Sequence, residues 1–314
     1  MSKQIAIVFP GQGSQSVGML AELAAAQPLV EATFAEASAV LGMDLWHLVS
    51  QGPKELLDRT DLTQPAMLTA GVAVWRVWQA AGGPQPAWLA GHSLGEFTAL
   101  VCADALGFAD AVALVVQRGR FMQEAVPPGA GAMAAILGLP DDQVAAACEE
   151  AAQGQVLAPV NFNSPGQVVI AGEAAAVERG IAAAKARGAK RAVPRPVSVP
   201  SHCALMRPAA ERLAVALAAV DIAAPRIPVL HNASVDTAQT PEAIRERLVR
   251  QLYSPVRWVE TVRRLGDAGV TRVIEAGPGK VLAGLTKRID DRLEGLAVFD
   301  PKGLAAALEA TQHD

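Results

Sequence analysis

The chain has 314 residues, of which 51% are hydrophobic and 18% are charged, so one large domain or two smaller ones could bury a sizeable core. Its net charge of −4 and the lack of a basic stripe with interleaved aromatic residues argue against nucleic-acid binding. No apolar stretch approaches the ~20 residues of a membrane span, and the apolar run at 5–9 is too short for a signal peptide. We expect a soluble, cytoplasmic protein.

The cysteines indicate a reducing compartment. Cys102, Cys148 and Cys203 are odd in number and have no paired spacing. No histidine or carboxylate cluster accompanies them at metal-ligand spacing. We expect free, buried thiols, with no metal and no cofactor.

Short apolar segments alternate with helical ones along the chain. The apolar segments are rich in Val, Ile and Leu without strict alternation, as in parallel strands buried on both faces. Strands are expected at 5–9, 88–90, 227–230, 272–275 and 296–299, and helices at 66–81, 110–124, 206–220, 241–251 and 258–268. The predicted fold class is α/β with a mainly parallel sheet.

The middle of the chain is organised differently. Breaks rich in Pro and Gly at 126–131 and 194–196 enclose segments in the order β-α-β-β-α-β, the ferredoxin-like motif. Its strands are expected at 132–137, 156–161, 167–171 and 190–194, and its helices at 141–152 and 174–187. Residues 129–196 are thus predicted to form a small domain inserted into a large one made of residues 1–128 and 197–314. Such an insertion leaves a cleft at the junction, where we expect the site.

The segment Gly91-His92-Ser93-Leu94-Gly95 follows the strand at 88–90 and precedes a helix-forming run at 96–103. Strand, Gly-x-Ser-x-Gly and helix are the layout of the α/β-hydrolase-like nucleophile elbow. The turn is so tight that Ser93 takes a strained conformation, and side chains at positions 91 and 95 would clash with it. We predict that Ser93 is a nucleophile; the alternative is a tight turn without chemistry.

A serine nucleophile needs a base within hydrogen-bonding reach. The histidines of the chain are His47, His92, His202, His231 and His313. His313 lies in the C-terminal tail, His47 on an ordinary helix face, and His92 is held by the elbow and is expected to point away from Ser93. His202 ends an extended segment and precedes a helix, which is where α/β enzymes place a base. We predict His202 as the base; the alternative is a histidine satisfied at a turn.

A hydrolase triad also needs a carboxylate to orient the histidine. No acidic residue lies between the insert and His202, and Asp221 and Asp236 sit at helix or loop ends. A backbone carbonyl or an amide side chain could orient the imidazole instead. Arg118 is a second peculiarity, because its helical spacing lets it point inward, where its planar fork would bind a substrate carboxylate. The alternative is a solvent-facing arginine.

Two glycine-rich turns fail as nucleotide-binding motifs. The turn at 11–16 has Ser16 where the dinucleotide fingerprint needs its third glycine, and the turn at 277–280 is followed by Val281 where a phosphate loop needs Ser or Thr. Both fit better as tight turns at the carboxyl ends of parallel strands, where open α/β sheets gather their ligands. N–H groups of the first turn could supply half of an oxyanion hole.

Eight motifs together resemble the bacterial malonyl-CoA:acyl carrier protein transacylase family along essentially the whole chain. They are Phe9-Pro10-Gly11-Gln12-Gly13-Ser14-Gln15, Gly91-His92-Ser93-Leu94-Gly95-Glu96, Arg118-Gly119, Gly131-Ala132-Met133, Asn161-Phe162-Asn163-Ser164-Pro165-Gly166-Gln167, Val199-Pro200-Ser201-His202, Gln251-Leu252-Tyr253 and Glu275-Ala276-Gly277-Pro278-Gly279. The resemblance implies transfer of a malonyl group from malonyl-CoA to the phosphopantetheine thiol of acyl carrier protein, for fatty acid biosynthesis.

The resemblance also assigns roles in the reaction. Ser93 would carry the malonyl group, and His202 would move the protons, oriented by the main-chain carbonyl of Gln251, which would account for the missing acid. The kinetics would be ping-pong, with CoA leaving before the carrier thiol attacks.

Further roles concern the oxyanion and the malonyl group. Backbone N–H groups of Gln12 and Leu94 would form the oxyanion hole, and Arg118 would bind the malonyl carboxylate. Ser201 departs from the phenylalanine usual at this place in malonyl-selective polyketide acyltransferase domains. A methyl-branched unit therefore stays an alternative substrate.

An acidic carrier protein should dock on a basic surface. The candidates are a patch of five residues and a separate pair: Lys185, Arg187, Lys190, Arg191 and Arg195, and Lys287 with Arg288. The alternative is that the basic residues before Gly188 only complement a helix dipole. We expect a monomer that needs no cofactor besides its substrates.

Other functions stay open on the residues alone. A serine esterase or thioesterase would use the same elbow but is weakened by the missing acid, and a non-catalytic carrier-binding subunit would be expected to lose Ser93 or His202. The same acyl transfer could also serve polyketide synthesis or malonate decarboxylation.

Overall fold

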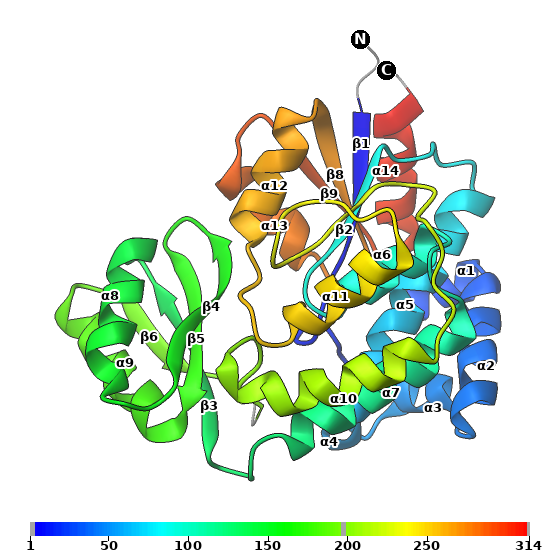
Figure 1. Cartoon of the computed structure of the whole chain (residues 1–314). Helices are drawn as coiled ribbons and strands as arrows, with labels where there is room; N and C mark the ends of the chain where they lie inside the picture. Colours follow the sequence, from blue (N-terminus) through cyan, green and yellow to red (C-terminus); the bar gives the residue numbers. More distant parts are fainter. Residues whose placement is uncertain (1–3, 196–198, 313–314) are drawn as a thin grey trace.

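The computed structural model describes residues 4–195 and 199–312. A five-stranded parallel sheet forms the centre of a large unit, with the strand order β7-β2-β1-β8-β9 (Figure 1). The strands are β1 (Gln4–Phe9), β2 (Trp88–Gly91), β7 (Val229–Leu230), β8 (Val270–Ala276) and β9 (Glu294–Val298). This confirms the predicted α/β class with a parallel sheet.

The sheet is buried on both faces, which is why its strands are apolar without strict alternation. Along β1, Ile5, Ile7 and Phe9 enter the larger core, whereas Ala6 and Val8 enter a second core on the other face. The larger core is closed by most of the helices, and the second by α12 and α13. The helices of the large unit are α1 (Ala21–Ala26), α2 (Leu29–Leu41), α3 (Leu45–Gln51), α4 (Lys54–Leu57), α5 (Thr60–Ala80), α6 (Gly95–Cys102), α7 (Phe108–Glu124), α10 (Arg207–Ala218), α11 (Pro241–Gln251), α12 (Trp258–Asp267), α13 (Val281–Ile289) and α14 (Pro301–Gln312), with a short 3₁₀ turn η1 (Ala204–Met206) before α10.

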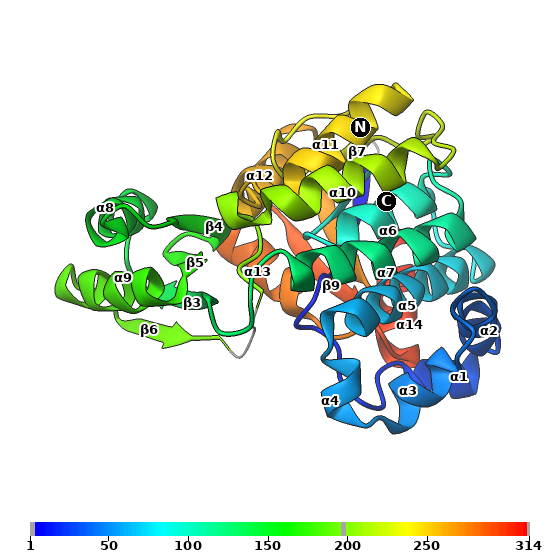
Figure 2. The same ribbon diagram turned by 60° about the horizontal axis from the view of Figure 1, so that its bottom comes forward.

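A small unit formed by residues 131–194 stands to one side of the large unit (Figures 1 and 2). Its antiparallel sheet has the order β4-β5-β3-β6, and its elements follow the chain order β3-α8-β4-β5-α9-β6 that was predicted as ferredoxin-like. They are β3 (Gly131–Leu137), α8 (Asp141–Ala152), β4 (Leu157–Ser164), β5 (Gln167–Glu173), α9 (Ala174–Ala186) and β6 (Arg191–Pro194). Helices α8 and α9 cover one face of this sheet.

The small unit is joined to the large one by more than its two connections. Phe162 N–H in β4 donates to the carbonyl of Val256 at 3.0 Å, and Val256 N–H donates to the carbonyl of Val160 at 2.8 Å. The open face of the small sheet also packs on Cys203 of the large unit. The domain boundaries at 128/129 and 196/197 stay predictions, and residues 196–198 lie outside the described residues.

Several predicted bounds differ from the observed ones by a few residues, and two of the differences have a visible cause. The strand expected at 227–230 is only Val229–Leu230, because Pro228 accepts a hydrogen bond from Leu89 N–H but has no N–H to extend the ladder. The helix expected from residue 66 begins at Thr60 and includes Pro65. The start of α5 packs closely on α7 at Gly119, where a Cβ would lie 2.7 Å from the Cα of Asp61. The first turn of α5 is therefore held closely against α7.

Candidate active site

The nucleophile elbow joins β2 to α6 at the carboxyl edge of the parallel sheet. Ser93 lies in the left-handed region at φ 53°, which is strained for a residue with a side chain. A Cβ on Gly91 would lie 1.8 Å from the carbonyl carbon of Gly95, and a Cβ on Gly95 would lie 2.1 Å from the carbonyl oxygen of Phe9. Only glycines permit this contact between strand and helix.

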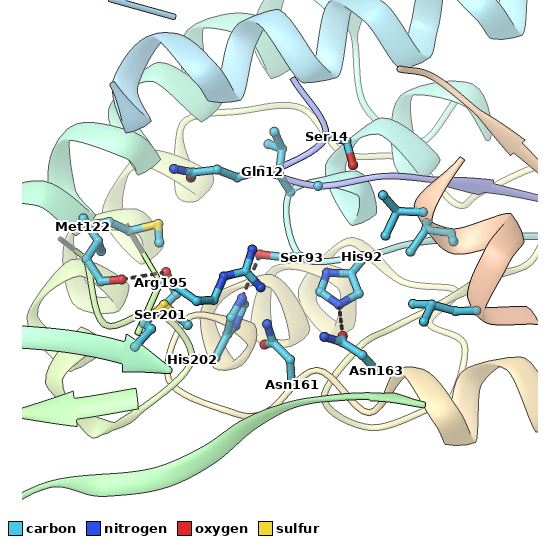
Figure 3. Close-up of a pocket in the computed structure, with 18 of the residues that line it drawn as sticks. Gln12, Ser14, His92, Ser93, Met122, Asn161, Asn163, Arg195, Ser201 and His202 are labelled. Carbon is cyan, nitrogen blue, oxygen red and sulfur yellow. Dashed lines mark hydrogen bonds between the residues drawn. The ribbon is translucent and has the colours of Figure 1, made fainter. Parts of the chain in front are cut away.

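His202 lies directly against the serine (Figure 3). Ser93 Oγ and His202 Nε2 are 2.7 Å apart, and His202 Nδ1 is 2.8 Å from the carbonyl oxygen of Gln251. If Nδ1 carries the proton, it donates to this carbonyl and leaves Nε2 free to accept from the serine. Burial, followed by the nearby positive charge of Arg118, lowers the pKa of His202 to about 3.

No carboxylate orients this imidazole among the described residues. Asp236 pairs with Arg247 at 2.6 Å, and Asp221 lies beside a different surface hollow next to α5. His47 is exposed on α3, and His92 Nε2 bonds Asn163 Oδ1 at 2.9 Å. His313 lies outside the described residues.

Arg118 is a buried cation next to the serine. Its side chain projects from α7, is 1% exposed, and places Nη2 3.5 Å from Ser93 Oγ. Nη1 donates to Gln64 Oε1 and Nη2 to Gln251 Oε1, each at 2.9 Å. Nε is buried without a hydrogen-bond acceptor among the described residues, so one donor of the guanidinium is unused.

The charge of Arg118 is kept despite its burial. Desolvation lowers its pKa to about 10, and the negative charge of Glu96 opposes this shift. Glu96 is fully buried on α6, directly after the elbow. The guanidinium therefore stays protonated at neutral pH.

The turn after β1 lies against the elbow. A Cβ on Gly11 would lie 2.4 Å from the carbonyl oxygen of His92, so a glycine is needed for this approach. The next residue, Gln12, lines the same pocket as Ser93 and Leu94. The backbone N–H groups of Gln12 and Leu94 have no hydrogen-bond acceptor in the described part of the chain.

The pocket lies between the two units (Figure 3). Met133, Asn161 and Asn163 reach it from the small sheet, and Leu282 and Leu285 reach it from α13. No role in the site was predicted from the sequence for these residues, nor for Gln64 and Glu96. Polar residues inside helices and strands carry no local signal for a shared pocket.

Other expectations concern metal sites, cysteines and membrane helices. The described residues contain no group of three or more His, Cys, Asp or Glu placed to hold a metal ion. Cys102, Cys148 and Cys203 are free and buried, and burial raises the pKa of each thiol. None of the described helices is both long and apolar enough to cross a membrane.

Residues 6–295 match the model of the acyl transferase domain family. The malonyl CoA-acyl carrier protein transacylase of Escherichia coli K12 is 63% identical over 306 residues, which cover 98% of this chain and 99% of that protein. The chain belongs to the malonyl CoA-acyl carrier protein transacylase family. The Bacillus subtilis transacylase is 46% identical over 315 residues, covering 100% of this chain and 99% of that one.

Solved structures of transacylases agree with the fold. The Coxiella burnetii malonyl CoA-acyl carrier protein transacylase superposes with a TM-score of 0.98 at 52% identity, covering 100% of this chain and 99% of that chain. A malonyl-transacylase in complex with its type II PKS acyl-carrier protein superposes with a TM-score of 0.97 at 59% identity, covering 98% and 100%. The resemblance stated from the sequence motifs is thereby confirmed.

Proposed function

We propose that this transacylase moves a malonyl group from malonyl-CoA to Ser93 and from Ser93 to the phosphopantetheine thiol of holo acyl carrier protein, for fatty acid biosynthesis. The observation that carries the proposal is the 2.7 Å contact of Ser93 Oγ with His202 Nε2 beside the buried, charged Arg118. A serine–histidine pair can transfer acyl groups, and the arginine can bind the free carboxylate of a dicarboxylic acyl group.

In the first half-reaction, His202 Nε2 accepts the proton of Ser93 while Oγ attacks the thioester carbonyl carbon. The N–H groups of Gln12 and Leu94 hydrogen-bond the oxyanion that forms. When the tetrahedral intermediate collapses, the C–S bond breaks and the CoA sulfur takes the proton from His202. The products are malonyl-Ser93 and free CoA.

The second half-reaction runs through the same groups in reverse. The carrier thiol gives its proton to His202 Nε2, and its sulfur attacks the ester carbon. Collapse breaks the ester C–O bond, and Ser93 Oγ recovers the proton. A thioester is made from a thioester, so neither a cofactor nor an external energy source is required.

The direct test is the mass of the intact protein after brief exposure to malonyl-CoA. We expect one malonyl adduct, absent from Ser93→Ala, that persists in buffer and moves to holo carrier protein added second. An adduct that vanishes in buffer with release of malonate would establish an esterase or thioesterase instead. No adduct would contradict acyl transfer altogether.

Arg118→Ala should separate malonyl transfer from acyl transfer in general. Removing a buried guanidinium from the malonyl carboxylate should lower the rate of malonyl transfer by at least about 100-fold, while acetyl transfer from acetyl-CoA survives or rises. Arg118→Lys keeps the charge without the fork and should be intermediate. Equal loss with both substrates would make the arginine structural.

The pH profile should show a base that stays neutral in the resting enzyme between pH 5 and pH 8. A lowered pKa keeps His202 neutral, so the acylation rate constant measured by rapid quench should be flat from pH 8 to pH 5. A histidine of ordinary pKa would lose about 30-fold in neutral fraction at pH 5. A falling limb near pH 6.5 would therefore contradict the buried, Arg118-perturbed base.

We also propose that carrier protein docks on basic side chains at the pocket mouth. Arg195 lines the pocket, and Arg288 Nη1 donates to Gln167 Oε1, which lines it too, at 3.1 Å. Arg187 is a weaker candidate because it already pairs with Glu150 at 2.7 Å. Both predicted patches thus have a member at or next to the mouth, and all seven of their residues are exposed.

Charge reversal tests the first patch. Lys190→Glu combined with Arg191→Glu should raise the KM for carrier protein about fivefold and leave the KM for malonyl-CoA unchanged, because rim charges steer a charged partner. Lys302→Glu on α14, which does not line the pocket, is the matched control. Unchanged kinetics would remove this patch and leave the Lys287 and Arg288 pair.

Substrate choice and setting complete the proposal. Ser201 lines the pocket, where a larger residue would narrow it, so a competition between malonyl-CoA and methylmalonyl-CoA decides whether branched units enter. We propose that the protein is cytoplasmic and monomeric. Sedimentation velocity tests the oligomeric state, since a monomer has a mass of 32.5 kDa. Service to polyketide assembly or malonate decarboxylation is the second candidate, tested by which carrier protein accepts the malonyl group.

A further inference from the structure

The backbone of the nucleophile is held by a side chain from a distant loop. Ser93 N–H donates to Asn232 Oδ1 at 2.7 Å, and Asn232 Nδ2 donates to the carbonyl oxygen of Gly91 at 2.6 Å. His92 N–H, between them, donates to Phe9 of β1 at 2.9 Å. Backbone groups of a strand alternate between its two neighbours, so Gly91 and Ser93 face the β7 side.

The side chain of Asn232 stands where the next residues of a strand would stand. Strand β7 pairs with β2 only through Val229 and Leu230 and then stops. The amide of Asn232 offers one acceptor and one donor, the same pair of groups that a strand backbone would present. It therefore extends the hydrogen-bond ladder of β2 up to the nucleophile itself.

The loop that carries Asn232 is strained. Val235 lies at φ 56°, a conformation that β-branched residues rarely adopt. Hydrogen bonds close the loop on itself, from His231 N–H to the carbonyl of Asp236 at 3.0 Å and from Val235 N–H to the carbonyl of His231 at 2.9 Å. Strain of this kind persists where surrounding contacts fix it, often next to a functional site.

Glu96 fixes the loop from the other side. Its Oε2 accepts from Asn232 N–H and from Gln251 Nε2, each at 2.9 Å, and its Oε1 is 2.7 Å from His231 Nδ1. Gln251 Nε2 is also 2.9 Å from the carbonyl oxygen of Ser93. Glu96 and Asn232 are both fully buried. The N–H and the carbonyl of Ser93 are thus held by two side chains that share one carboxylate.

We propose that Asn232 is a positioning residue for acyl transfer, seated by Glu96. It engages the N–H of Ser93, so that only the N–H groups of Leu94 and Gln12 remain for the oxyanion. It also keeps Ser93 at the φ that places Oγ 2.7 Å from His202. Asn232 touches neither substrate nor reacting atoms, and its effect passes entirely through the backbone of Ser93. This inference rests on the proposed function.

Asn232→Ala should lower the rate constants of both half-reactions by the same factor, up to about 100-fold, which is no more than the loss of an oxyanion-hole donor itself costs. Both steps use the same serine geometry, so neither should be spared. The KM for malonyl-CoA should stay within about twofold, because Arg118 is untouched. Ser234→Ala, which removes a hydrogen bond to Asp236 inside the same loop, should keep wild-type rates and controls for loosening of the loop.

Asn232→Asp gives a readout that a purely structural role would not move. A protonated carboxyl group has one acceptor and one donor and can replace the amide, whereas the ionised form repels the carbonyl of Gly91. Burial beside Glu96 should raise the pKa of the introduced carboxyl group. The acylation rate of this variant should therefore rise as pH falls from 8 to 5.5, while the wild-type rate stays flat.

The outcomes separate the inference from the function on which it rests. A wild-type enzyme that forms no malonyl-Ser93 removes the proposed function. If the wild type acylates, an Asn232→Ala protein with normal rates, or with a raised KM and an unchanged kcat, overturns the positioning role. Should Asn232→Ala fail to fold, as circular dichroism would show, Asn232→Asp decides: recovery at low pH supports the role, and a flat or falling profile overturns it.

Discussion

The contact between the end of β2 and the start of α6 is the constraint on which the site depends. Gly91 and Gly95 meet so closely that a Cβ on either would overlap backbone atoms, and Gly95 also meets Phe9 of β1. The strand can therefore turn into the helix within three residues, with Ser93 at the centre of the turn. The hydroxyl is raised above the sheet while the N–H of Leu94, at the positive end of α6, stays free. Loss of this contact would misplace Ser93, the proposed nucleophile, and the proposed oxyanion hole together.

A second constraint is the burial of charge around the serine. Arg118 and Glu96 are both out of solvent, and they are connected through the amide of Gln251, whose Oε1 accepts from the arginine and whose Nε2 donates to the carboxylate. A buried charge is tolerated when it is paired or hydrogen-bonded. Gln251 also contacts the serine and the histidine, since its Nε2 donates to the carbonyl of Ser93 and its main-chain carbonyl is 2.8 Å from His202 Nδ1. Glu96, Arg118 and Gln251 come from three different helices, α6, α7 and α11.

The sequence predicted the parts that local patterns encode. The elbow, the parallel strands and the ferredoxin-like order follow from glycine spacing, apolar runs and turn residues. The start of α5 could not be predicted, because packing of Gly119 against Asp61 decides it and that contact is far apart in the chain. Asn232 could not be found either: it is one polar residue in a loop, and its meaning depends on β7 ending after two residues beside β2. Long-range polar contacts leave no periodicity to read.

The charges around His202 explain why its Nδ1 faces a main-chain carbonyl and not a carboxylate. A carboxylate in that position would be buried beside Arg118 and, in the role proposed for this arginine, would compete with the malonyl carboxylate for the guanidinium. It would also favour the imidazolium, which the adjacent positive charge opposes. The neutral carbonyl of Gln251 orients the ring without adding charge, so the charge of Arg118 remains available to the substrate. Binding of a carboxylate at Arg118, as proposed, would offset only the smaller cause of the lowered pKa of His202, and burial, the larger cause, would remain.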